Sequence, residues 1–313
     1  MTKKDYLTDE KYFVFKEKWG TVVEMMEYWK KDELDNKENP KKVIIPDTID
    51  WKEVKTIGES AFWWRHFTSV IIPNTVISIG IGAFAFNDFK EVTIPDSVTE
   101  IRNKAFHNNH ITELTIPDSV TKIGNYAFEN NNLIKIKIPN SITEIGWGAF
   151  RGNHLKEIKI PDSVTKIEDY VFEKNNLIKA TIPDSVTLIG NNAFAHNDLT
   201  SVTIPDSVKR IGDLAFQKND LIKVIIPDSV TEIGWGAFRD NNLKEITIPD
   251  SVTEIGREAF LGNNLKKVTI GADIEIEIDD CGDTFENNFV DFYKEKGKEA
   301  WTYVYKNGEW EQK

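Results

Sequence analysis

The chain has 313 residues, of which 51 are acidic and 39 basic, and its net charge at pH 7 is −12. Such a chain has little attraction for phosphate backbones or anionic lipids, which disfavours nucleic-acid binding and peripheral membrane binding. Its single cysteine, Cys281, excludes an intramolecular disulfide framework and a multi-cysteine zinc site. No stretch approaches the ~18 apolar residues of a membrane span, so we expect no membrane insertion.

The N-terminal segment, residues 1–40, predicts a hairpin cap and a connector. Tyr12–Lys16 and Thr21–Trp29 flank Lys18-Trp19-Gly20, a pattern typical of two strands joined by a turn. The charged stretch Lys31–Lys42 follows and is expected to be solvated. A cap of this kind would cover the first unpaired edge of a stack of strands.

Residues 41–270 repeat a unit of 22 residues, close to P-D-S-V-T-x-I-G-x-x-A-F-x-x-N-x-L-x-x-V-x-I. A fixed period of this length predicts a solenoid of about ten stacked coils, each in contact mainly with its neighbours. The first unit, Pro46–Ile72, is longer, with 27 residues and an excess around Asp50–Lys55, so we expect a bulge there. The period is marked by Pro73, Pro95, Pro117, Pro139, Pro161, Pro183, Pro205, Pro227 and Pro249.

Each unit predicts two extended segments and two turns. The alternation that ends a unit, as in Ile111–Ile116, indicates a half-buried strand, and stacked units place these strands in a parallel sheet on one face. The V-T-x-I segment predicts a second short strand. Proline, aspartate and serine favour a turn in which the last two bond their own backbone. The spacing of Gly-x-x-Ala-Phe, as in Gly146–Phe150, predicts a short helical turn.

Two residues recur in the units and predict the core. A phenylalanine in every unit is expected to point inward and to form a stacked column. An asparagine closes each regular unit, and we interpret it as an inward ladder that satisfies backbone groups rather than as a row of substrate-binding amides. The phenylalanines are Phe62, Phe84, Phe106, Phe128, Phe150, Phe172, Phe194, Phe216, Phe238 and Phe260, and the asparagines are Asn87, Asn109, Asn131, Asn153, Asn175, Asn197, Asn219, Asn241 and Asn263.

Residues 271–313 predict a C-terminal cap. Asp273–Ile278 alternates like a strand, and Asn287–Lys298 carries a helical pattern of aromatic residues. Asn307-Gly308 lies between two alternating segments and favours a hairpin turn. The predicted order is therefore strand, helix and hairpin.

The repeated run I-P-x-S-V-T-x-I-G-x-x-A-F-x-x-N-x-L-x-x-V-x-I resembles the BspA-like class of leucine-rich repeat proteins over Pro46–Ile270. The resemblance implies a bacterial, non-catalytic protein-binding module in cell adhesion or host recognition, at the cell surface or secreted. The N-terminus lacks the apolar run of a secretory signal, which predicts a cytoplasmic protein if Met1 is the natural start.

Exposed aromatic residues are the candidate partner-binding sites. Trp147 and Trp235 follow the turn glycine in two nearly identical units, on the side expected to face outward. Trp63, Trp64 and Phe86 are expected to cluster near the N-terminal end, where packing under a cap is the alternative to partner contact. For Trp147 and Trp235, the alternative to partner binding is that the unit was duplicated and that both side chains pack partly on neighbouring coils. Tryptophan and tyrosine are enriched at binding hot spots.

The outward positions of the sheet carry mainly charges and threonine. One position follows the order Glu113, Lys135, Glu157, Lys179, Ser201, Lys223, Glu245 and Lys267. Opposite charges on neighbouring strands favour one register, which is our interpretation of this row. No aromatic residue lies there, so the sheet face has no clear anchor for a partner.

Metal binding, cofactors and catalysis are not expected. His110 and His154 occupy the same position two coils apart, too far from each other to share a zinc ion. The aspartates after the prolines, Asp162, Asp184, Asp206, Asp228 and Asp250, predict turns, with an oxygen-rich calcium site as the alternative. The sequence has no nucleophile elbow, phosphate-binding loop, dinucleotide motif or HExxH.

Three functions follow from these patterns. The first is a monomeric protein-binding module in adhesion or partner recognition. The second is a cytoplasmic scaffold or regulatory binder, and the third is a carbohydrate-active or calcium-dependent surface protein that uses the aspartates or the exposed tryptophans.

Overall fold

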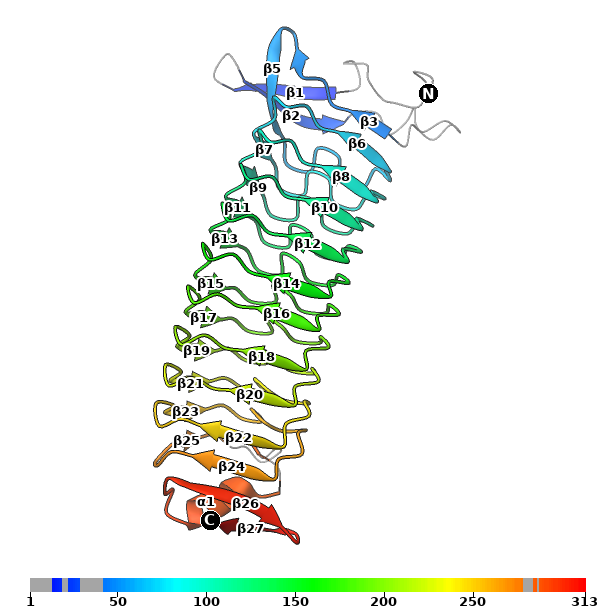
Figure 1. Ribbon diagram of the computed structural model, residues 1–313. Helices are drawn as coiled ribbons and strands as arrows, with labels where there is room; N and C mark the ends of the chain where they lie inside the picture. Colours follow the sequence, from blue (N-terminus) through cyan, green and yellow to red (C-terminus); the bar gives the residue numbers. More distant parts are fainter. Residues whose placement is uncertain (1–12, 19–21, 29–41, 278–283, 286) are drawn as a thin grey trace. The chain divides into compact units, whose positions relative to one another are not determined.

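The computed structural model describes residues 13–18, 22–28, 42–277, 284–285 and 287–313, and both Cys281 and most of the predicted connector lie outside these ranges. The chain divides into two compact units, Met1–Leu155 and Lys156–Lys313. Both units consist of stacked coils of 22 residues with two parallel sheets (Figure 1). The predicted solenoid is therefore confirmed.

In the first unit, one face carries the three-residue strands that end each repeat. Another carries a second row, called the shorter strands here because all of them except the first, Lys52–Ile57, have two residues. The former are β3 (Lys42–Ile44), β6 (Ser69–Ile71), β8 (Glu91–Thr93), β10 (Glu113–Thr115) and β12 (Lys135–Lys137). The latter are β5 (Lys52–Ile57), β7 (Ser78–Ile79), β9 (Glu100–Ile101), β11 (Lys122–Ile123) and β13 (Glu144–Ile145). Where neighbouring strands in these rows pair, they do so in parallel with an offset of one repeat, as between β8 and β10 or β9 and β11.

The second unit repeats this plan. Its longer strands are β14 (Glu157–Lys159), β16 (Lys179–Thr181), β18 (Ser201–Thr203), β20 (Lys223–Ile225), β22 (Glu245–Ile248) and β24 (Lys267–Ile270). Its shorter strands are β15 (Lys166–Ile167), β17 (Leu188–Ile189), β19 (Arg210–Ile211), β21 (Glu232–Ile233), β23 (Glu254–Ile255) and β25 (Glu275–Ile276). The register places Glu157 opposite Lys179 and Glu245 opposite Lys267, as opposite charges favour.

The phenylalanine column lies at the centre of every coil, where each ring is fully buried. In the first unit consecutive rings from Phe62 to Phe150 stack with centroids 5.2, 5.3, 5.5 and 5.7 Å apart. In the second unit the rings from Phe172 to Phe260 stack with centroids 5.4 to 5.5 Å apart, and Phe285 of the C-terminal cap stacks on the last of them. Because a stacked pair gains about 0.5–1.5 kcal/mol beyond its area burial, the column ties each coil to the next.

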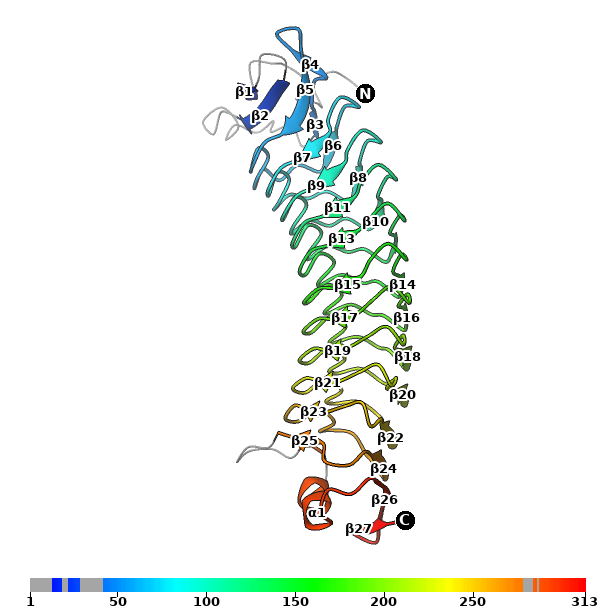
Figure 2. The same ribbon diagram turned by 90° about the vertical axis from the view of Figure 1, so that its left-hand side faces the viewer.

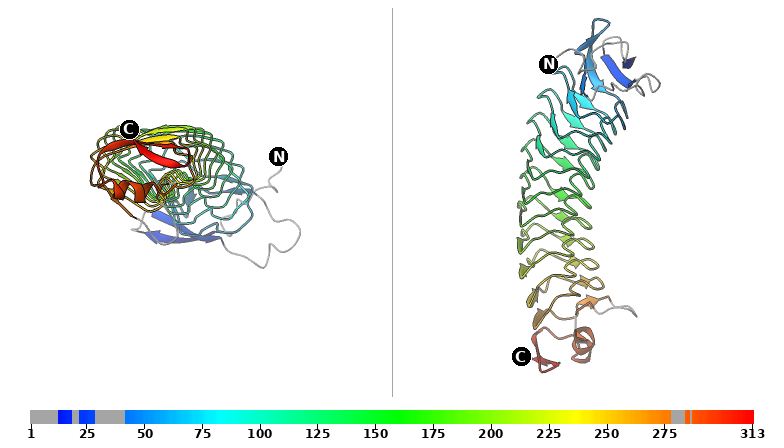
Figure 3. Two further views of the ribbon diagram at one scale, coloured as in Figure 1. Left: turned by 90° about the horizontal axis from the view of Figure 1, so that it is seen from below. Right: turned by 90° about the vertical axis from the view of Figure 1, so that its right-hand side faces the viewer.

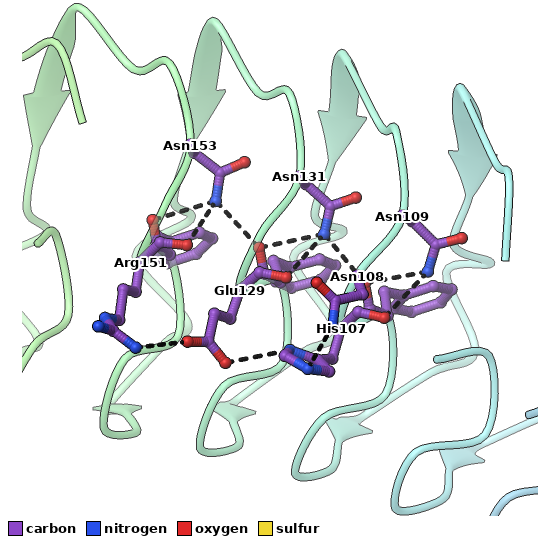
Figure 4. Close-up of polar contacts among 10 residues, drawn as sticks. His107, Asn108, Asn109, Glu129, Asn131, Arg151 and Asn153 are labelled. Carbon is purple, nitrogen blue, oxygen red and sulfur yellow. Dashed lines mark hydrogen bonds and ion pairs between the residues drawn. The ribbon is translucent and has the colours of Figure 1, made fainter. Parts of the chain in front are cut away.

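The asparagine ladder runs beside the rings and links neighbouring coils through the backbone (Figure 4). The amide nitrogen of Asn131 donates to the carbonyl oxygens of Phe106 in the preceding coil, at 2.9 Å, and of Phe128 in its own coil, at 3.1 Å. The amide oxygen of Asn131 accepts from the backbone N–H of Ile111, at 3.1 Å. The ladder predicted from the sequence is thus confirmed, since these side chains are buried and hydrogen-bonded to the backbone.

The two turns of each coil differ from the prediction. Gly146–Phe150 and its equivalents form tight hydrogen-bonded turns rather than helical turns, because the third residue, here Gly148, has a positive φ of 57° that interrupts a right-handed helix. The Pro-Asp-Ser turn closes when the N–H of Val208 donates to the carbonyl of Pro205. The hydroxyl of Ser207 donates to the carbonyl of Val186 in the preceding coil, at 2.6 Å, and not to its own turn.

Additional strands occur at the N-terminal end of the first unit. Strands β1 (Phe13–Lys18) and β2 (Val22–Tyr28) pair antiparallel where the sequence predicts a hairpin, and β2 continues the shorter-strand sheet by pairing with β5. The first repeat also forms β4 (Thr48–Ile49), which lies just before its extra residues and pairs antiparallel with β5. The resulting hairpin projects beyond the neighbouring coils of this unit (Figure 2).

The C-terminal end of the second unit is covered by a helix and two antiparallel strands (Figure 3). Strand β26 (Trp301–Lys306) pairs antiparallel with β24, and β27 (Glu309–Gln312) pairs with β26. Helix α1 (Phe289–Glu295) is shorter than the predicted range and packs Phe289 against the ring of Trp310 at 4.8 Å. Strand β25 likewise covers only part of the predicted strand.

Candidate binding surface

Three exposed aromatic side chains in the first unit form a cluster, named here the aromatic patch: Trp63, Trp64 and Phe86. Their rings lie 5.3 to 5.9 Å apart and contact one another in all three pairs. They keep 44%, 56% and 37% of their surface exposed. The structure therefore brings these predicted residues together and leaves their outer faces open to solvent.

Two residues of the aromatic patch adopt a costly backbone conformation. Trp64 and Phe86 have φ values of 54° and 58°. This left-handed region costs about 1 kcal/mol or more for a bulky residue and is best tolerated by glycine and asparagine. The equivalent position of later coils is occupied by Asn108, Asn130, Gly152, Lys174, His196, Lys218, Asp240 and Gly262. Aromatic side chains are thus unfavourable for the coil itself, which points to a use outside the fold.

Trp147 and Trp235, the other predicted pair, are half-exposed, at 50% and 41%. Their backbone N–H groups donate to side-chain oxygens of the preceding coil, Asn125 Oδ1 at 3.0 Å and Asp213 Oδ1 at 2.9 Å. The backbone is therefore held while the indole remains accessible. The two residues belong to different units, and each is a separate candidate.

Sequence reasoning missed other exposed apolar residues. Trp51 is fully exposed between β4 and β5 and has a φ of 65°. The length of the first repeat was the signal for it, because five additional residues have to leave the coil. Ile222 and Ile225 are each 65% exposed beside or on β20. Both isoleucines lie on or beside a predicted strand, so the sequence signal for them was an apolar residue at a position expected to be exposed.

A polar network continues from the aromatic patch across the next coils (Figure 4). His107 contacts the Phe86 ring edge-on at 5.1 Å, and its Nδ1 lies 3.0 Å from Glu129 Oε2. Arg151 donates to the other carboxylate oxygen of Glu129 at 2.9 Å, and Asn108 Nδ2 lies 2.8 Å from His107 Nε2. His107, Glu129 and Arg151 occupy the same position in three successive coils and join these coils through their side chains.

Glu129 is the buried centre of this network, with 9% of its side chain exposed. Burial alone would raise the pKa of Glu129, but the contacts with His107 and Arg151 outweigh it, so the pKa lies below its ordinary value of 4.5. A carboxyl group whose pKa is lower in the folded state stabilises the fold above its unfolded pKa. That stabilisation is lost as the pH falls through the folded pKa.

Glu129→Gln should therefore lower the free energy of unfolding at pH 7 by about 1–3 kcal/mol, the usual worth of hydrogen bonds to a charged group. The difference in free energy of unfolding between the variant and the unmodified protein should shrink as the pH falls below about 4.5. Only the unmodified protein has an ionised carboxylate at this position to lose. Urea unfolding at pH 7 and pH 3.5 measures both values. Glu113→Gln, on an exposed strand position, is the control and should change little. A deficit that persists unchanged at pH 3.5 would contradict this account.

The histidines and aspartates do not converge on a metal. His66 Nδ1 and His110 Nε2 lie 3.4 and 3.8 Å from the two carboxylate oxygens of Asp88, all on exposed side chains. Within the described ranges, no group of three or more His, Cys, Asp or Glu side chains is placed to hold a metal ion. The aspartates after the prolines are exposed in the turns.

Calcium should not stabilise this protein measurably. The Pro205–Val208 turn is closed by a backbone hydrogen bond, and the Ser207 hydroxyl joins it to the preceding coil, so no cation is needed to hold the turn. Specific binding at 100 times the dissociation constant would add about 2.7 kcal/mol. We expect the same melting temperature in millimolar calcium and in chelator. An increase of several degrees that is lost in Asp206→Asn would instead establish a calcium site.

Comparison with known proteins agrees with the class of fold, a leucine-rich repeat solenoid. The model of the BspA type leucine rich repeat region, in six copies, matches residues 55–179 and 165–288. The chain belongs to this family. No curated protein matches it, and in the described part of the chain no helix is both long and apolar enough to cross a membrane.

Solved structures with the same fold come from several bacteria. A leucine-rich repeat protein of T. pallidum is 25% identical, covers 60% of this chain and 88% of its own, and has a TM-score of 0.50. A leucine-rich repeat protein from Bacteroides ovatus is 23% identical over 86% of this chain and 91% of its own, also with a TM-score of 0.50. The pneumococcal vaccine antigen PcpA is 20% identical over 84% and 80%, with a TM-score of 0.58.

Proposed function

We propose that this chain is a non-catalytic module that binds a protein partner, and that the aromatic patch is its principal contact. The observation that carries the proposal is the combination of exposure and backbone conformation at Trp64 and Phe86. Both rings are accessible, and both occupy a position where the coil would be better served by asparagine or glycine. Partner recognition in adhesion, the role implied by the family resemblance, is the form of the proposal that we favour.

The charged sheet face is a weaker candidate for binding energy. Exposed ion pairs contribute about 0–1 kcal/mol, whereas truncation of an interface tryptophan costs roughly 2 kcal/mol or more. Glu157 and Lys179 lie opposite each other on β14 and β16 with exposed side chains. Their neutralisation is therefore a suitable control for loss of an aromatic anchor.

The test compares four proteins as immobilised baits for extracts of the native source or of host matrix. Besides the unmodified chain, these are Trp63→Ala with Trp64→Asn and Phe86→Asn, Trp147→Ala with Trp235→Ala, and Glu157→Gln with Lys179→Gln. Each replacement in the first variant introduces a residue that another coil carries at that position, Ala85 for Trp63 and Asn108 for Trp64 and Phe86, so the melting temperature should stay the same or rise. The affinity of each retained protein is then measured by titration calorimetry.

We expect a partner whose affinity falls at least tenfold in the aromatic-patch variant and changes little in the Glu157–Lys179 variant. Trp147 and Trp235 are proposed as additional anchors, and their double variant should also weaken binding at least tenfold. A partner that responds to the charge pair and not to any tryptophan would move the binding face to the sheet. Fractionation of the native source separates surface adhesion from a cytoplasmic scaffold.

A further inference from the structure

A shallow polar pocket of about 340 Å³ opens in the first unit. Its walls come from three consecutive coils and comprise Asn108, His110, Asn130, Asn132, Gly152 and His154. The ladder residues Asn109 and Asn131 also line it, and because they are buried they form its base. The ladder amides bond the backbone, so their geometry is determined by the fold and the pocket is preformed (Figure 4).

The composition of the pocket selects a chemical class of ligand. Among the residues that line it there is no lysine, arginine, aspartate or glutamate. Phosphate and carboxylate recognition relies on cationic side chains such as lysine and arginine, so anionic ligands are poorly matched. Amide and imidazole groups offer donors and acceptors side by side. Neighbouring hydroxyl groups of a neutral sugar, each of which both donates and accepts, are the complement of such a wall.

Gly152 keeps the pocket open. It has a φ of +65°, and a Cβ atom built there would clash with Asn130 Oδ1. The preceding coils carry Asn108 and Asn130 at the same position, also with positive φ. A side chain at Gly152 would therefore have to push the Asn130 amide aside and enter the space of the pocket.

The pocket is continuous with the aromatic patch. Trp64 and Phe86 precede Asn108 at the same position of the two earlier coils, and His107 connects Phe86 to Asn108 by contacts of 5.1 and 2.8 Å. Sugar rings stack their C–H faces on aromatic side chains, and the coils repeat every 5.3 to 5.5 Å along this part of the phenylalanine column. This repeat is close to the length of one sugar unit in an extended glycan, so successive sugars meet successive coils.

We propose that the row from Trp64 to Gly152, with His110, Asn132 and His154 beside it, binds a neutral glycan lying along the coils. The rings of Trp64 and Phe86 stack on one end of the glycan. Amides and imidazoles of the pocket bond the hydroxyl groups of the other end. This inference shares Trp64 and Phe86 with the proposed protein contact, but the pocket from Asn108 to Gly152 lies outside the aromatic patch, so different variants test the two proposals.

The experiment uses the full chain on an array of neutral glycans, followed by calorimetric titration of the oligosaccharide retained most strongly. Gly152→Asn displaces the Asn130 amide and puts a second amide into the pocket. The two preceding coils carry asparagine at this position with a positive φ, so the coil should still fold. Gly262→Asn makes the same change at the equivalent position of the second unit, where φ is +72°, and is the matched control. We expect Gly152→Asn to weaken glycan binding at least tenfold and Gly262→Asn to leave it unchanged.

Three results would overturn the proposal: no neutral glycan bound by the unmodified chain, binding only to sulfated or sialylated glycans, or equal affinity in Gly152→Asn. A melting curve for each variant shows that it is folded. Asn132 is a half-exposed wall residue that does not belong to the ladder. Asn132→Ala is therefore a second variant, and it should also reduce the affinity for the glycan. Failure of the protein-partner proposal would be seen separately, because Gly152→Asn leaves all three aromatic-patch residues in place.

Discussion

Phe194→Ala should lower the free energy of unfolding by about 3–5 kcal/mol, the usual cost of truncating a large core side chain. The Phe194 ring is fully buried and stacks on Phe172 at 5.5 Å and on Phe216 at 5.4 Å. Its removal leaves a cavity at the centre of one coil and breaks two stacking contacts. Because each coil depends on its neighbours, we also expect the denaturation curve to split into two steps.

The control for this experiment is Trp235→Ala, which removes an even larger ring from the same unit. Its side chain is 41% exposed, so little packing is lost and the free energy of unfolding should fall by no more than about 1 kcal/mol. Chemical denaturation followed by circular dichroism measures both variants. Equal stability of Phe194→Ala and the unmodified protein would reject the role of the phenylalanine column.

Asn241→Ala should cost about 3 kcal/mol or more, although it deletes only a small polar side chain. The Asn241 amide donates to the carbonyls of Phe216 at 2.9 Å and Phe238 at 3.0 Å, and its oxygen accepts from the N–H of Leu221 at 3.1 Å. Alanine leaves these backbone groups buried without their partner, and each such group costs about 1–3 kcal/mol. The loss therefore comes from desolvated backbone in two coils.

The adjacent residue, Asn242, offers a matched control. Its amide bonds Asp220 at 3.2 Å on the exposed surface, where water can replace the lost contact. Asn242→Ala should change the free energy of unfolding by less than about 0.5 kcal/mol. The difference between the two alanine variants, measured in one urea titration series, isolates the effect of burial. Similar values for both would show that the ladder contributes no more than a surface amide.

Much of the coil could be predicted because each repeat obeys local rules that are repeated along the chain. The alternation in Leu114 and its neighbours determines which side chains of β10 face inward, and the parallel register follows from stacking equal units. Constant phenylalanine and asparagine positions identify the core for the same reason. A residue type that recurs at one depth of every coil has the same surroundings each time.

The turn conformations could not be predicted from spacing. The i, i+3, i+4 pattern at Gly146–Phe150 suits a helical turn, but the N–H of Tyr126 in the preceding coil donates to the carbonyl of Trp147. Hydrogen bonds between coils are thus made in addition to the bond inside the turn, from the N–H of Ala149 to the carbonyl of Gly146. The Ser207 hydroxyl likewise bonds Val186 in the preceding coil. Such bonds exist only once the coils are stacked.

The candidate site, too, could be predicted only in part. The sequence named Trp63, Trp64 and Phe86 as exposed aromatic candidates, since these residues depart from the repeat pattern. Their mutual contacts, their positive φ values and the preformed pocket near Gly152 depend on how successive coils place equivalent positions side by side. Period and residue type determined the solenoid and its core, because each coil repeats the same local chemistry. Only the tertiary structure decided the turns, the projecting hairpin and the surface sites, because these depend on contacts between coils.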